Sequence, residues 1–270
     1  MKIRIIAGLT LTPLLFVVVL VLPEIWTAVA VSVICGIAAY EMLWRTGLVK
    51  TLSMVICSVI VAAAVPFWCY CGTPYIWGAA GFLVLFVALF AHLLFSGGKI
   101  PFVEVAYSFI AAAVIPFMLS ALVRILCATN GRYMIMAPFC MAFLSDIGAY
   151  FVGKFFGKRK LAPIISPKKT IEGMVGGVIT DILGMLVYAW ILEQGVGVQV
   201  NYIAAAVYGL TGAFVAVIGD LCFSVIKRQT GIKDYGNLIP GHGGALDRFD
   251  SVILVAPMAE LLFLLLPMVV

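Results

Sequence analysis

The chain has 270 residues, of which 64% are hydrophobic and 11% are charged, and its formal net charge is +5. Because a soluble domain carries roughly 25% charged residues, this composition excludes a soluble protein and indicates an integral membrane protein. The seven Cys residues are an odd number, which argues against a complete disulfide framework.

Apolar runs long enough to span a bilayer recur along the whole chain. A hydrocarbon core about 30 Å thick needs about 20 apolar residues per helix. Runs such as 14–22 and 81–95 are continuously apolar, whereas β-barrel strands would alternate in polarity over short segments. The predicted fold class is therefore all-α, a polytopic integral membrane protein. Nine transmembrane helices are predicted, at residues 5–22, 26–44, 51–69, 75–95, 103–126, 134–156, 171–192, 203–226 and 251–269.

The first run follows Lys2 and Arg4, as in a signal peptide, but no small-residue cleavage site precedes Pro23, so it is expected to remain as a span. With nine spans, all 17 Lys and Arg residues except Arg124 and Arg132 fall on the side of the N-terminus. Since positively charged loops stay in the cytoplasm, the N-terminus is expected inside and the C-terminus outside. A compact nine-span chain fits a bacterial inner membrane, with the basic side facing anionic headgroups.

Charge divides the chain into two parts. Residues 1–130, spans 1–5, are expected to be an N-terminal transmembrane scaffold, because few ionisable groups lie within their apolar runs. Residues 131–270, spans 6–9, carry nearly all the other ionisable groups and are expected to be the catalytic half, with two cytoplasmic loops within 153–170 and 227–250. The ionisable residues within the apolar runs of the first part are Glu41, His92, Glu104 and Arg124.

The sixth span combines an acidic residue with small residues. Asp146, Tyr150, Gly153 and Gly157 lie along one helical stripe. A glycine stripe is more typical of close helix packing than of ligand contact. Asp146, which we expect to be buried in an apolar run, instead indicates a functional site.

Basic residues precede the seventh span. Lys158 is followed by the run Ser166-Pro-Lys168-Lys169-Thr170, which joins hydroxyl and ammonium groups to a helix N-terminus. This combination suits a triphosphate, although topology-setting charge at a membrane face is an equal alternative. Gly173 and Gly177, within that span, are more typical of a packing face.

The eighth span ends on a polar face. Asp220, Ser224, Lys227 and Arg228 recur at helical spacing, so they share one side of the cytoplasmic end. That face can hold a cation and a phosphate together. A carboxylate within a membrane span is expensive and indicates function; a polar contact between helices, or hydration near the interface, is the alternative.

Two carboxylates, Asp247 and Asp250, lead into the ninth span and are neighbours on one side of a first helical turn. Such a pair repels unless a cation or a proton intervenes, and oxygen ligands of this kind suit Mg²⁺. Gly243 and Gly244 permit close approach of the backbone to a ligand, and a helix N-terminus favours an anion. Acidic residues in a first turn are also ordinary complements to the helix dipole.

The polar groups of the last four spans all lie toward the cytoplasmic side, so they can meet in one cavity open to the inner leaflet. Carboxylates for Mg²⁺ and cations for phosphate are the groups that phosphoryl or nucleotidyl transfer requires. No Walker A, GxGxxG or HExxH pattern occurs, which excludes the P-loop, dinucleotide and zinc-protease routes.

The run 224–250, SVIKRQTGIKDYGNLIPGHGGALDRFD, resembles the signature of phosphatidate cytidylyltransferases, also called CDP-diacylglycerol synthases. Segments 145–158 and 166–173 resemble the same family's upstream motifs. One position departs from the pattern, because Ala245 stands where the family usually has a larger aliphatic residue. The N-terminal half matches only in being hydrophobic.

The resemblance implies transfer of the cytidylyl group from CTP to phosphatidic acid, giving CDP-diacylglycerol and pyrophosphate for phospholipid synthesis. Mg²⁺ and a second cation are the implied cofactors; CTP, phosphatidic acid and membrane lipids are the implied partners, without nucleic acid, and a homodimer is left open. The implied metal ligands are Asp220, Asp247 and Asp250, with Asp146 as a further ligand or a nucleoside contact. The residues expected to neutralise phosphates in catalysis are Lys227, Arg228, Lys233 and Arg248. The residues expected to bind substrate are Tyr150, Lys158, Ser166, Lys168, Lys169, Thr170, Ser224, His242, Gly243 and Gly244.

Three alternatives are weighed against this function. Another CTP-using membrane enzyme, such as a polyprenol or diacylglycerol kinase, would release CDP in place of pyrophosphate. An anion transporter would have polar residues along its pathway up to both membrane faces, but the outward half of the predicted spans contains very few polar residues. A purely structural scaffold would not explain why at least four carboxylates accompany the basic residues.

Overall fold

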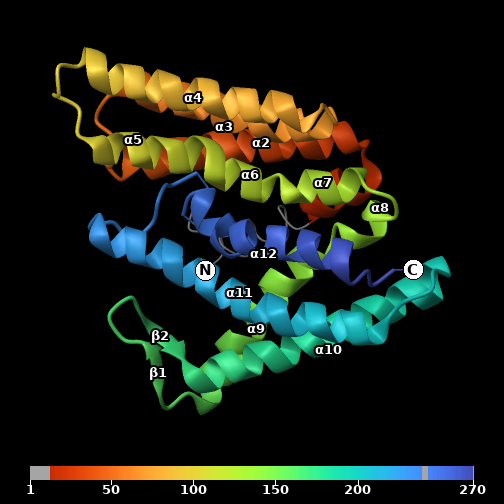
Figure 1. Ribbon diagram of the computed structural model, residues 1–270. Helices are drawn as coiled ribbons and strands as arrows, with labels where there is room; N and C mark the ends of the chain where they lie inside the picture. The colour runs from red at the N-terminus through yellow and green to blue at the C-terminus, as the bar shows by residue number, and fades with distance from the viewer. Residues whose placement is uncertain (1–12, 239–242, 270) are drawn as a thin grey trace. The chain divides into compact units, whose positions relative to one another are not determined.

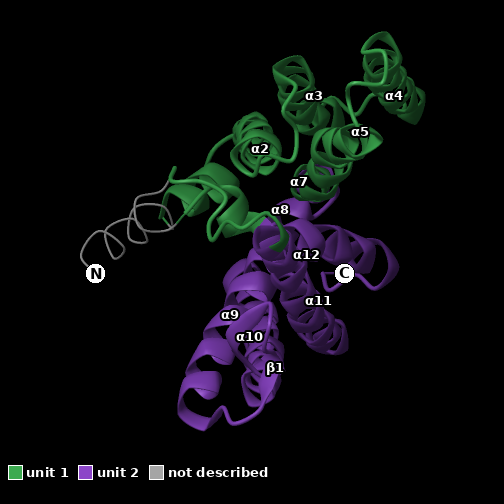
Figure 2. Ribbon diagram, turned by 90° about the vertical axis from the view of Figure 1, so that its left-hand side faces the viewer, with its two compact units in different colours: residues 1–124, 229–249 green, residues 125–228, 250–270 purple. Residues whose placement is uncertain are grey.

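The computed structural model describes residues 13–238 and 243–269 (Figure 1). Their regular secondary structure is helical except for two short strands, which confirms the all-α fold class. Within the described part, the sheet is a single two-stranded hairpin. The chain forms two compact units (Figure 2): unit 1 comprises residues 1–124 and 229–249, and unit 2 comprises residues 125–228 and 250–270.

Unit 1 contains the helices of the early apolar runs. In lipid, every backbone polar group must be satisfied within the protein, so continuous apolar runs fold as helices. Helices α2 and α3 pack along each other. Gly36 permits this approach, because a Cβ there would lie 3.5 Å from the Ala63 Cβ. The elements are η1 (Val17–Val21), α2 (Glu24–Tyr40), η2 (Glu41–Arg45), α3 (Leu52–Tyr70), α4 (Tyr75–Phe95), α5 (Phe102–Phe109), η3 (Ile110–Val114), α6 (Ile115–Leu119) and α7 (Ala121–Cys127), where η denotes a π-helical segment and α7 runs past the unit boundary.

Unit 2 is built around the pair α9 and α10. Small residues let these two helices approach closely: a Cβ on Gly173 would lie 2.8 Å from the Ala149 carbonyl oxygen, and one on Gly177 would lie 2.8 Å from that of Ser145. The prediction that Gly173 and Gly177 form a packing face is therefore confirmed. The elements are α8 (Gly131–Met134), α9 (Ala137–Phe156), β1 (Lys160–Ala162), β2 (Ser166–Thr170), α10 (Ile171–Val196), α11 (Tyr202–Gln229) and α12 (Leu246–Leu265), whose first turn belongs to unit 1.

Seven helices among the described residues are long and apolar enough to cross a membrane, and they correspond to the second to eighth predicted spans. The predicted span 75–95 coincides with α4. The first predicted span begins within residues 1–12, outside the described residues. The ninth corresponds to α12, which carries four charged residues, Asp247, Arg248, Asp250 and Glu260. A count of nine spans and an inside N-terminus stay predictions.

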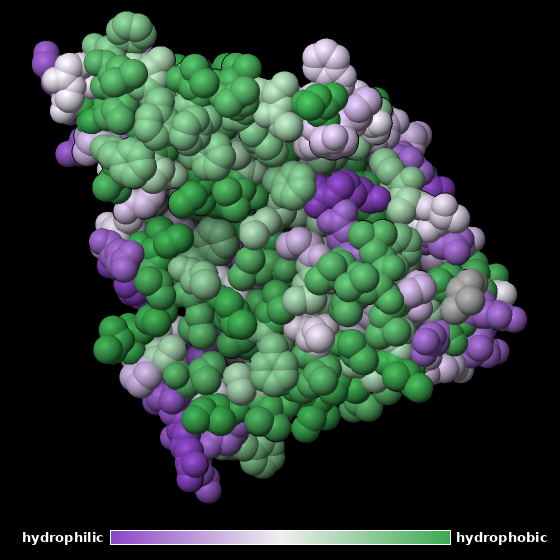
Figure 3. Space-filling view, in the orientation of Figure 1, coloured by the Kyte–Doolittle hydropathy of each residue, from purple (hydrophilic) through white to green (hydrophobic). Residues whose placement is uncertain are grey.

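The surface supports a lipid environment. Large apolar side chains are exposed, including Phe95 at 91%, Ile203 at 77% and Leu94 at 76%. Figure 3 shows a face on which hydrophobic residues predominate. A soluble monomer rarely exposes contiguous apolar surface on this scale, so the protein is a multi-pass membrane protein.

The hairpin of β1 and β2 was not among the predicted elements. It forms within the segment expected to be a cytoplasmic loop, with Lys160 opposite Thr170 and Ala162 opposite Ser166. Its open end is closed where α10 begins, because the Ile171 amide donates to the Arg159 carbonyl oxygen at 2.9 Å. The hairpin gives the basic run before α10 a defined backbone.

Candidate active site

Asp220 is the central carboxylate of a polar cluster in unit 2. It lies on α11, where Ser224, one turn further on, donates a hydrogen bond to its Oδ1 at 3.1 Å. The Nζ of Lys169, on β2, lies 2.5 Å from its Oδ2. Both side chains of this ion pair are about three-quarters buried, at 22% and 25% exposure. The polar face predicted for the end of the eighth span therefore meets the hairpin.

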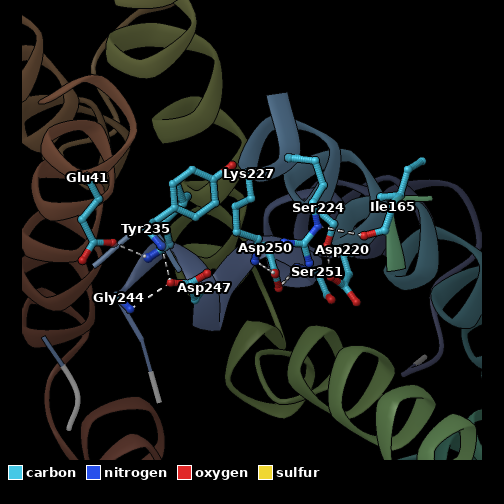
Figure 4. A network of polar contacts seen from close by, with 12 residues as sticks. Glu41, Ile165, Asp220, Ser224, Lys227, Tyr235, Gly244, Asp247, Asp250 and Ser251 are labelled. Carbon is cyan, nitrogen blue, oxygen red and sulfur yellow. Dashed lines mark hydrogen bonds and ion pairs between the residues drawn. The ribbon is translucent and has the colours of Figure 1, made fainter. Parts of the chain in front are cut away.

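Asp250, on α12, lies at the same end of α11. Its Oδ2 is 3.9 Å from the Nζ of Lys227, and both side chains are largely buried (Figure 4). Gly219 makes this approach possible, because a Cβ there would lie 2.8 Å from the Asp250 carbonyl oxygen. The carboxylates of Asp220 and Asp146 are close enough to repel that of Asp250, and Lys227 attracts it.

We call Asp146, Lys169, Asp220, Lys227 and Asp250 the lysine–carboxylate cluster. It brings together three carboxylates from α9, α11 and α12 and two ammonium groups from β2 and α11. Like-charged carboxylates this close repel one another unless a cation or a proton lies among them. In the structure, two of these carboxylates are paired with lysines, Asp220 with Lys169 and Asp250 with Lys227.

The hairpin is tied to the helices beside this cluster. Arg228 Nε, near the end of α11, donates to the Ile165 carbonyl oxygen at 3.2 Å. Thr170 is the N-cap of α10, and its Oγ1 accepts from the Gly173 amide at 3.1 Å. Glu172 accepts from the Lys158 and Arg159 amides at 3.0 and 3.1 Å. These contacts position Lys169 against Asp220.

Asp247 lies in unit 1 and organises the loop between α11 and α12. Its Oδ2 accepts from the Tyr235 amide at 2.7 Å and from the Gly244 amide at 2.9 Å (Figure 4). The residue is 8% exposed. Gly243 has φ +86°, and a Cβ there would lie 2.8 Å from Asp247 Oδ2, so glycine is required at this turn.

A second carboxylate of unit 1, Glu41, contacts the same loop. Its two oxygens accept from the amides of Ala245 and Leu246 at 3.1 and 2.9 Å. The sequence-based prediction placed Glu41 in the scaffold and gave it no role. An ionisable residue inside an apolar span was the available signal, because such residues are expensive and usually functional. Glu172 was also missed as a site residue, although it follows the SPKKT run directly.

The predicted site residues divide between the two units. Asp146, Lys169, Asp220, Ser224, Lys227 and Asp250 meet in unit 2, where Ser166, Thr170 and Arg228 belong to the adjoining hairpin and helix end. Asp146 was expected to be buried but its side chain is exposed, because Ser145 and Gly148 are the residues of this part of α9 that pack inward. His242 lies outside the described residues. The exposed predicted residues of unit 2 are Asp146, Tyr150, Lys158, Lys168 and Arg228; those of unit 1 are Lys233 and Arg248.

The glycine stripe of α9 is explained by packing. Cβ atoms on Gly153 and Gly157 would lie 3.0 and 2.8 Å from Thr170 Oγ1. Tyr150 points away from this contact, and the Lys154 ammonium lies 5.8 Å from the centre of its ring. The two glycines therefore seat the N-cap of α10 against α9.

The donor chemistry of the lysine–carboxylate cluster fits a hard divalent cation. Carboxylate oxygens are the protein ligands that Mg²⁺ prefers, usually one or two of them with water and substrate phosphates completing the shell. Among the described residues, no three His, Cys, Asp or Glu side chains form a ready-made metal site. A cation here would therefore depend on substrate oxygens as well as on protein carboxylates.

The fold and this cluster define a multi-pass helical membrane protein in which carboxylates and lysines gather near helix ends. The chain belongs to the cytidylyltransferase family, whose sequence model matches residues 2–266. This confirms the resemblance predicted from the run 224–250.

Individual relatives agree with the family match. The chain is 34% identical over 178 residues to the phosphatidate cytidylyltransferase of Staphylococcus haemolyticus (strain JCSC1435), covering 65% of each chain. It is 35% identical over 188 residues to that of Staphylococcus aureus (strain COL), covering 69% of this chain and 67% of the relative. The aligned region thus spans about two thirds of the length of these curated relatives.

Proposed function

We propose that this protein transfers the cytidylyl group of CTP to phosphatidic acid. The phosphate oxygen of the lipid attacks the α-phosphorus of CTP and forms a new phosphoanhydride bond. The bond between the α-phosphorus and the oxygen that bridges to the β-phosphorus breaks, and pyrophosphate leaves with that electron pair. The products are CDP-diacylglycerol and pyrophosphate.

The observation that carries this proposal is the pairing of two lysines with two carboxylates in unit 2: Lys169 with Asp220 at 2.5 Å and Lys227 with Asp250 at 3.9 Å. Phosphoryl-transfer sites work mainly by positioning and charge neutralisation. A lysine that already lies beside a carboxylate is placed to neutralise a phosphate held by the same site. The family membership and the names of the relatives support a cytidylyl donor and a phosphatidate acceptor.

The residues take separate parts in the transfer. Lys169 and the exposed Lys168 would grip the phosphates of CTP, while Lys227 and Arg228 would neutralise charge at the reacting phosphates. A phosphate monoester with a second pKa near about 6 is largely dianionic at neutral pH, so the lipid needs no strong general base. Lys233, Arg248 and His242 are assigned to phosphate contacts by the resemblance alone.

Asp220 and Asp250, with Asp146 as a further ligand, would hold Mg²⁺, and a second cation would share these carboxylates. When bound, Mg²⁺ supplies charge neutralisation at the phosphate oxygens and orients them for in-line displacement. Asp247 is also assigned as a ligand by the resemblance; its Oδ2 accepts two backbone amides in this structure.

The setting of the reaction follows from topology. We expect the N-terminus and the loops before α10 and α12 to lie on the cytoplasmic side of a bacterial inner membrane, because basic residues gather in these segments and positively charged loops stay in the cytoplasm. The lipid would enter laterally between helices, since its acyl chains leave the bilayer only at a large free-energy cost. A homodimer is a further expectation, which size measurement in detergent tests.

The test follows the fate of each phosphate of CTP. Purified protein is incubated in detergent with Mg²⁺, phosphatidic acid and CTP labelled either at the α- or at the γ-phosphate. The proposal predicts that the α-label enters the lipid and the γ-label appears as pyrophosphate. Entry of the γ-label into a lipid, with release of CDP, would identify a CTP-dependent kinase. Movement of intact anions across vesicles without any transfer of label would identify a transporter.

A further inference from the structure

Glu41 caps a helix that begins 205 residues later in the chain. It is the first residue of η2, and it is 3% exposed. Its Oε1 accepts from the Ala245 amide at 3.1 Å and its Oε2 from the Leu246 amide at 2.9 Å. Helix α12 begins at Leu246, so these two amides lie at the helix N-terminus, where N–H groups have no carbonyl acceptor within the helix. One carboxylate in the first part of the chain therefore satisfies both.

Two glycines leave room for this carboxylate. A Cβ on Gly236 would lie 2.2 Å from Glu41 Oε1, and a Cβ on Gly244 would lie 2.3 Å from Oε1 and 2.4 Å from Oε2. Real Cβ atoms do not approach oxygen this closely, so any side chain at either position would displace the carboxylate. Gly236 and Gly244 thus leave room for the Glu41 carboxylate beside the described residues of this loop, and Figure 4 shows Glu41 and Gly244 on neighbouring segments.

Glu41 and Asp247 together accept four amides of this loop and of the first turn of α12. Asp247 accepts from Tyr235 and Gly244, and Glu41 accepts from Ala245 and Leu246. The two carboxylates repel each other, and Arg45 attracts Glu41. An uncharged Ser or Asn could cap a helix without that repulsion. The negative charge at this terminus is favourable only because the helix dipole and the amides face it.

We propose that Glu41 is a positioning residue for the cytidylyl-transfer site. By accepting the Ala245 and Leu246 amides, it fixes the first turn of α12, which carries Asp247 and Arg248 and directly precedes Asp250. This inference rests on the proposed function for its effect on turnover, whereas its effect on the loop rests on the contacts alone. It gives a role in the reaction to the N-terminal half of the chain.

The alternative is that Glu41 occupies a phosphate site. A glycine-rich loop before a helix N-terminus binds anions, and a substrate phosphate would then have to displace the carboxylate. Two hydrogen bonds and 3% exposure favour a permanent anchor over an exchangeable group. The two possibilities predict different KM values for CTP in the Glu41 variants: loss of a phosphate competitor lowers the KM, whereas loss of an anchor leaves it nearly unchanged.

The first measurement is amide hydrogen exchange of the purified full-length protein. Glu41→Ala removes both acceptors, and Glu41→Gln keeps an oxygen but removes the charge. Glu24→Gln is the matched control, because Glu24 begins the same helix and is exposed. We expect exchange at Ala245 and Leu246 to accelerate by about tenfold or more in Glu41→Ala and less in Glu41→Gln. Unchanged exchange in Glu41→Ala would overturn the anchor.

The second measurement is steady-state kinetics of the same variants. A positioning role predicts that kcat falls by about tenfold or more in Glu41→Ala, with the KM for CTP changed by less than about threefold. Glu41→Asp, which keeps the charge one methylene short, should restore part of kcat. A KM for CTP that falls in Glu41→Gln would show that Glu41 competes with a phosphate and would overturn the proposal.

A third measurement covers the case in which Glu41→Ala does not fold. Gly236→Ala should lower kcat in the wild-type background, because its Cβ meets the Glu41 carboxylate. In a Glu41→Asp background, where the carboxylate is withdrawn by one methylene, Gly236→Ala should lower kcat by a smaller factor. If the effects of the two substitutions on kcat were additive in free energy, the contact between Gly236 and Glu41 would be contradicted. If the wild-type protein makes no CDP-diacylglycerol at all, the proposed function fails, while hydrogen exchange still decides whether Glu41 anchors the loop.

Discussion

Lys169 on the β-hairpin lies 2.5 Å from Asp220 on α11, so the basic run before one membrane helix is held by a carboxylate near the end of the next. Thr170 and Glu172 fix the hairpin to α10, and Arg228 fixes it to α11. Lys169 and Asp220 are 51 positions apart in the sequence, yet their ion pair joins the hairpin and the end of α11 in one polar surface. That surface is where we expect the phosphates of CTP to bind.

Removal of the Lys169 ammonium group should weaken CTP binding. Lys169→Met leaves Asp220 without its cation and the phosphates without a donor; charge-assisted hydrogen bonds contribute about 1.5–3 kcal/mol. We expect the KM for CTP to rise by about 10- to 100-fold. Lys99→Met is the control, because Lys99 is exposed in the loop before α5 and should leave the KM unchanged. An equal rise in both variants would mean a general effect of lost positive charge.

Substitution of the two aspartates at the start of α12 should affect the stability of the protein differently. Asp250→Asn is expected to abolish Mg²⁺-dependent turnover while leaving the thermal unfolding midpoint in detergent nearly unchanged. Asp247→Asn should also abolish turnover, but it weakens two backbone hydrogen bonds and should lower the free energy of unfolding by about 1–3 kcal/mol. Wild-type activity in both variants would remove the metal-site hypothesis.

Gly219 should be required for the spacing of Asp220 and Asp250. In Gly219→Ala the new Cβ meets the Asp250 carbonyl oxygen and the Ser251 Cα, at 2.8 and 3.1 Å. Because both are backbone atoms, α11 and α12 must separate, which costs about 1–3 kcal/mol. We expect turnover to fall with stability. Gly195→Ala, on α10, meets nothing within 4 Å and should raise stability slightly; unfolding midpoints and turnover of the two variants are compared directly.

Loss of the α10 N-cap should affect substrate affinity through the hairpin. Thr170→Ala removes the acceptor for the Gly173 amide, at a cost of about 1 kcal/mol. Because Lys169 precedes Thr170, we expect the KM for CTP to rise, and Thr170→Ser should restore it. Failure of Ser to restore the KM would show that the Thr170 methyl group, not its hydroxyl, matters here.

Helices were predictable from the sequence because their signal is local. The run 75–95 coincides with α4, and the spacing of Asp220, Ser224, Lys227 and Arg228 correctly predicted a helix that continues to Gln229. The hairpin was not predictable from the sequence, because its strands of three and five residues are too short to show a periodic pattern.

Long-range partners were the part of the site that the sequence could not supply. Glu41 lies 204 residues from Ala245, and a single glutamate at the end of an apolar run does not indicate what it binds. The glycines before α12 were expected to bring the backbone close to a ligand. At Gly244 the group that the backbone approaches is the Glu41 carboxylate.

Binding of Mn²⁺ in place of Mg²⁺, followed by electron paramagnetic resonance in the presence of CTP, tests most directly whether the carboxylates of α11 and α12 hold the cation. We predict that the wild-type protein and Glu24→Gln bind Mn²⁺ with the same affinity, and that Asp220→Asn and Asp250→Asn each weaken it by about 10- to 100-fold. Mn²⁺ binding of wild-type strength in both aspartate variants, with their folds intact, would contradict the account.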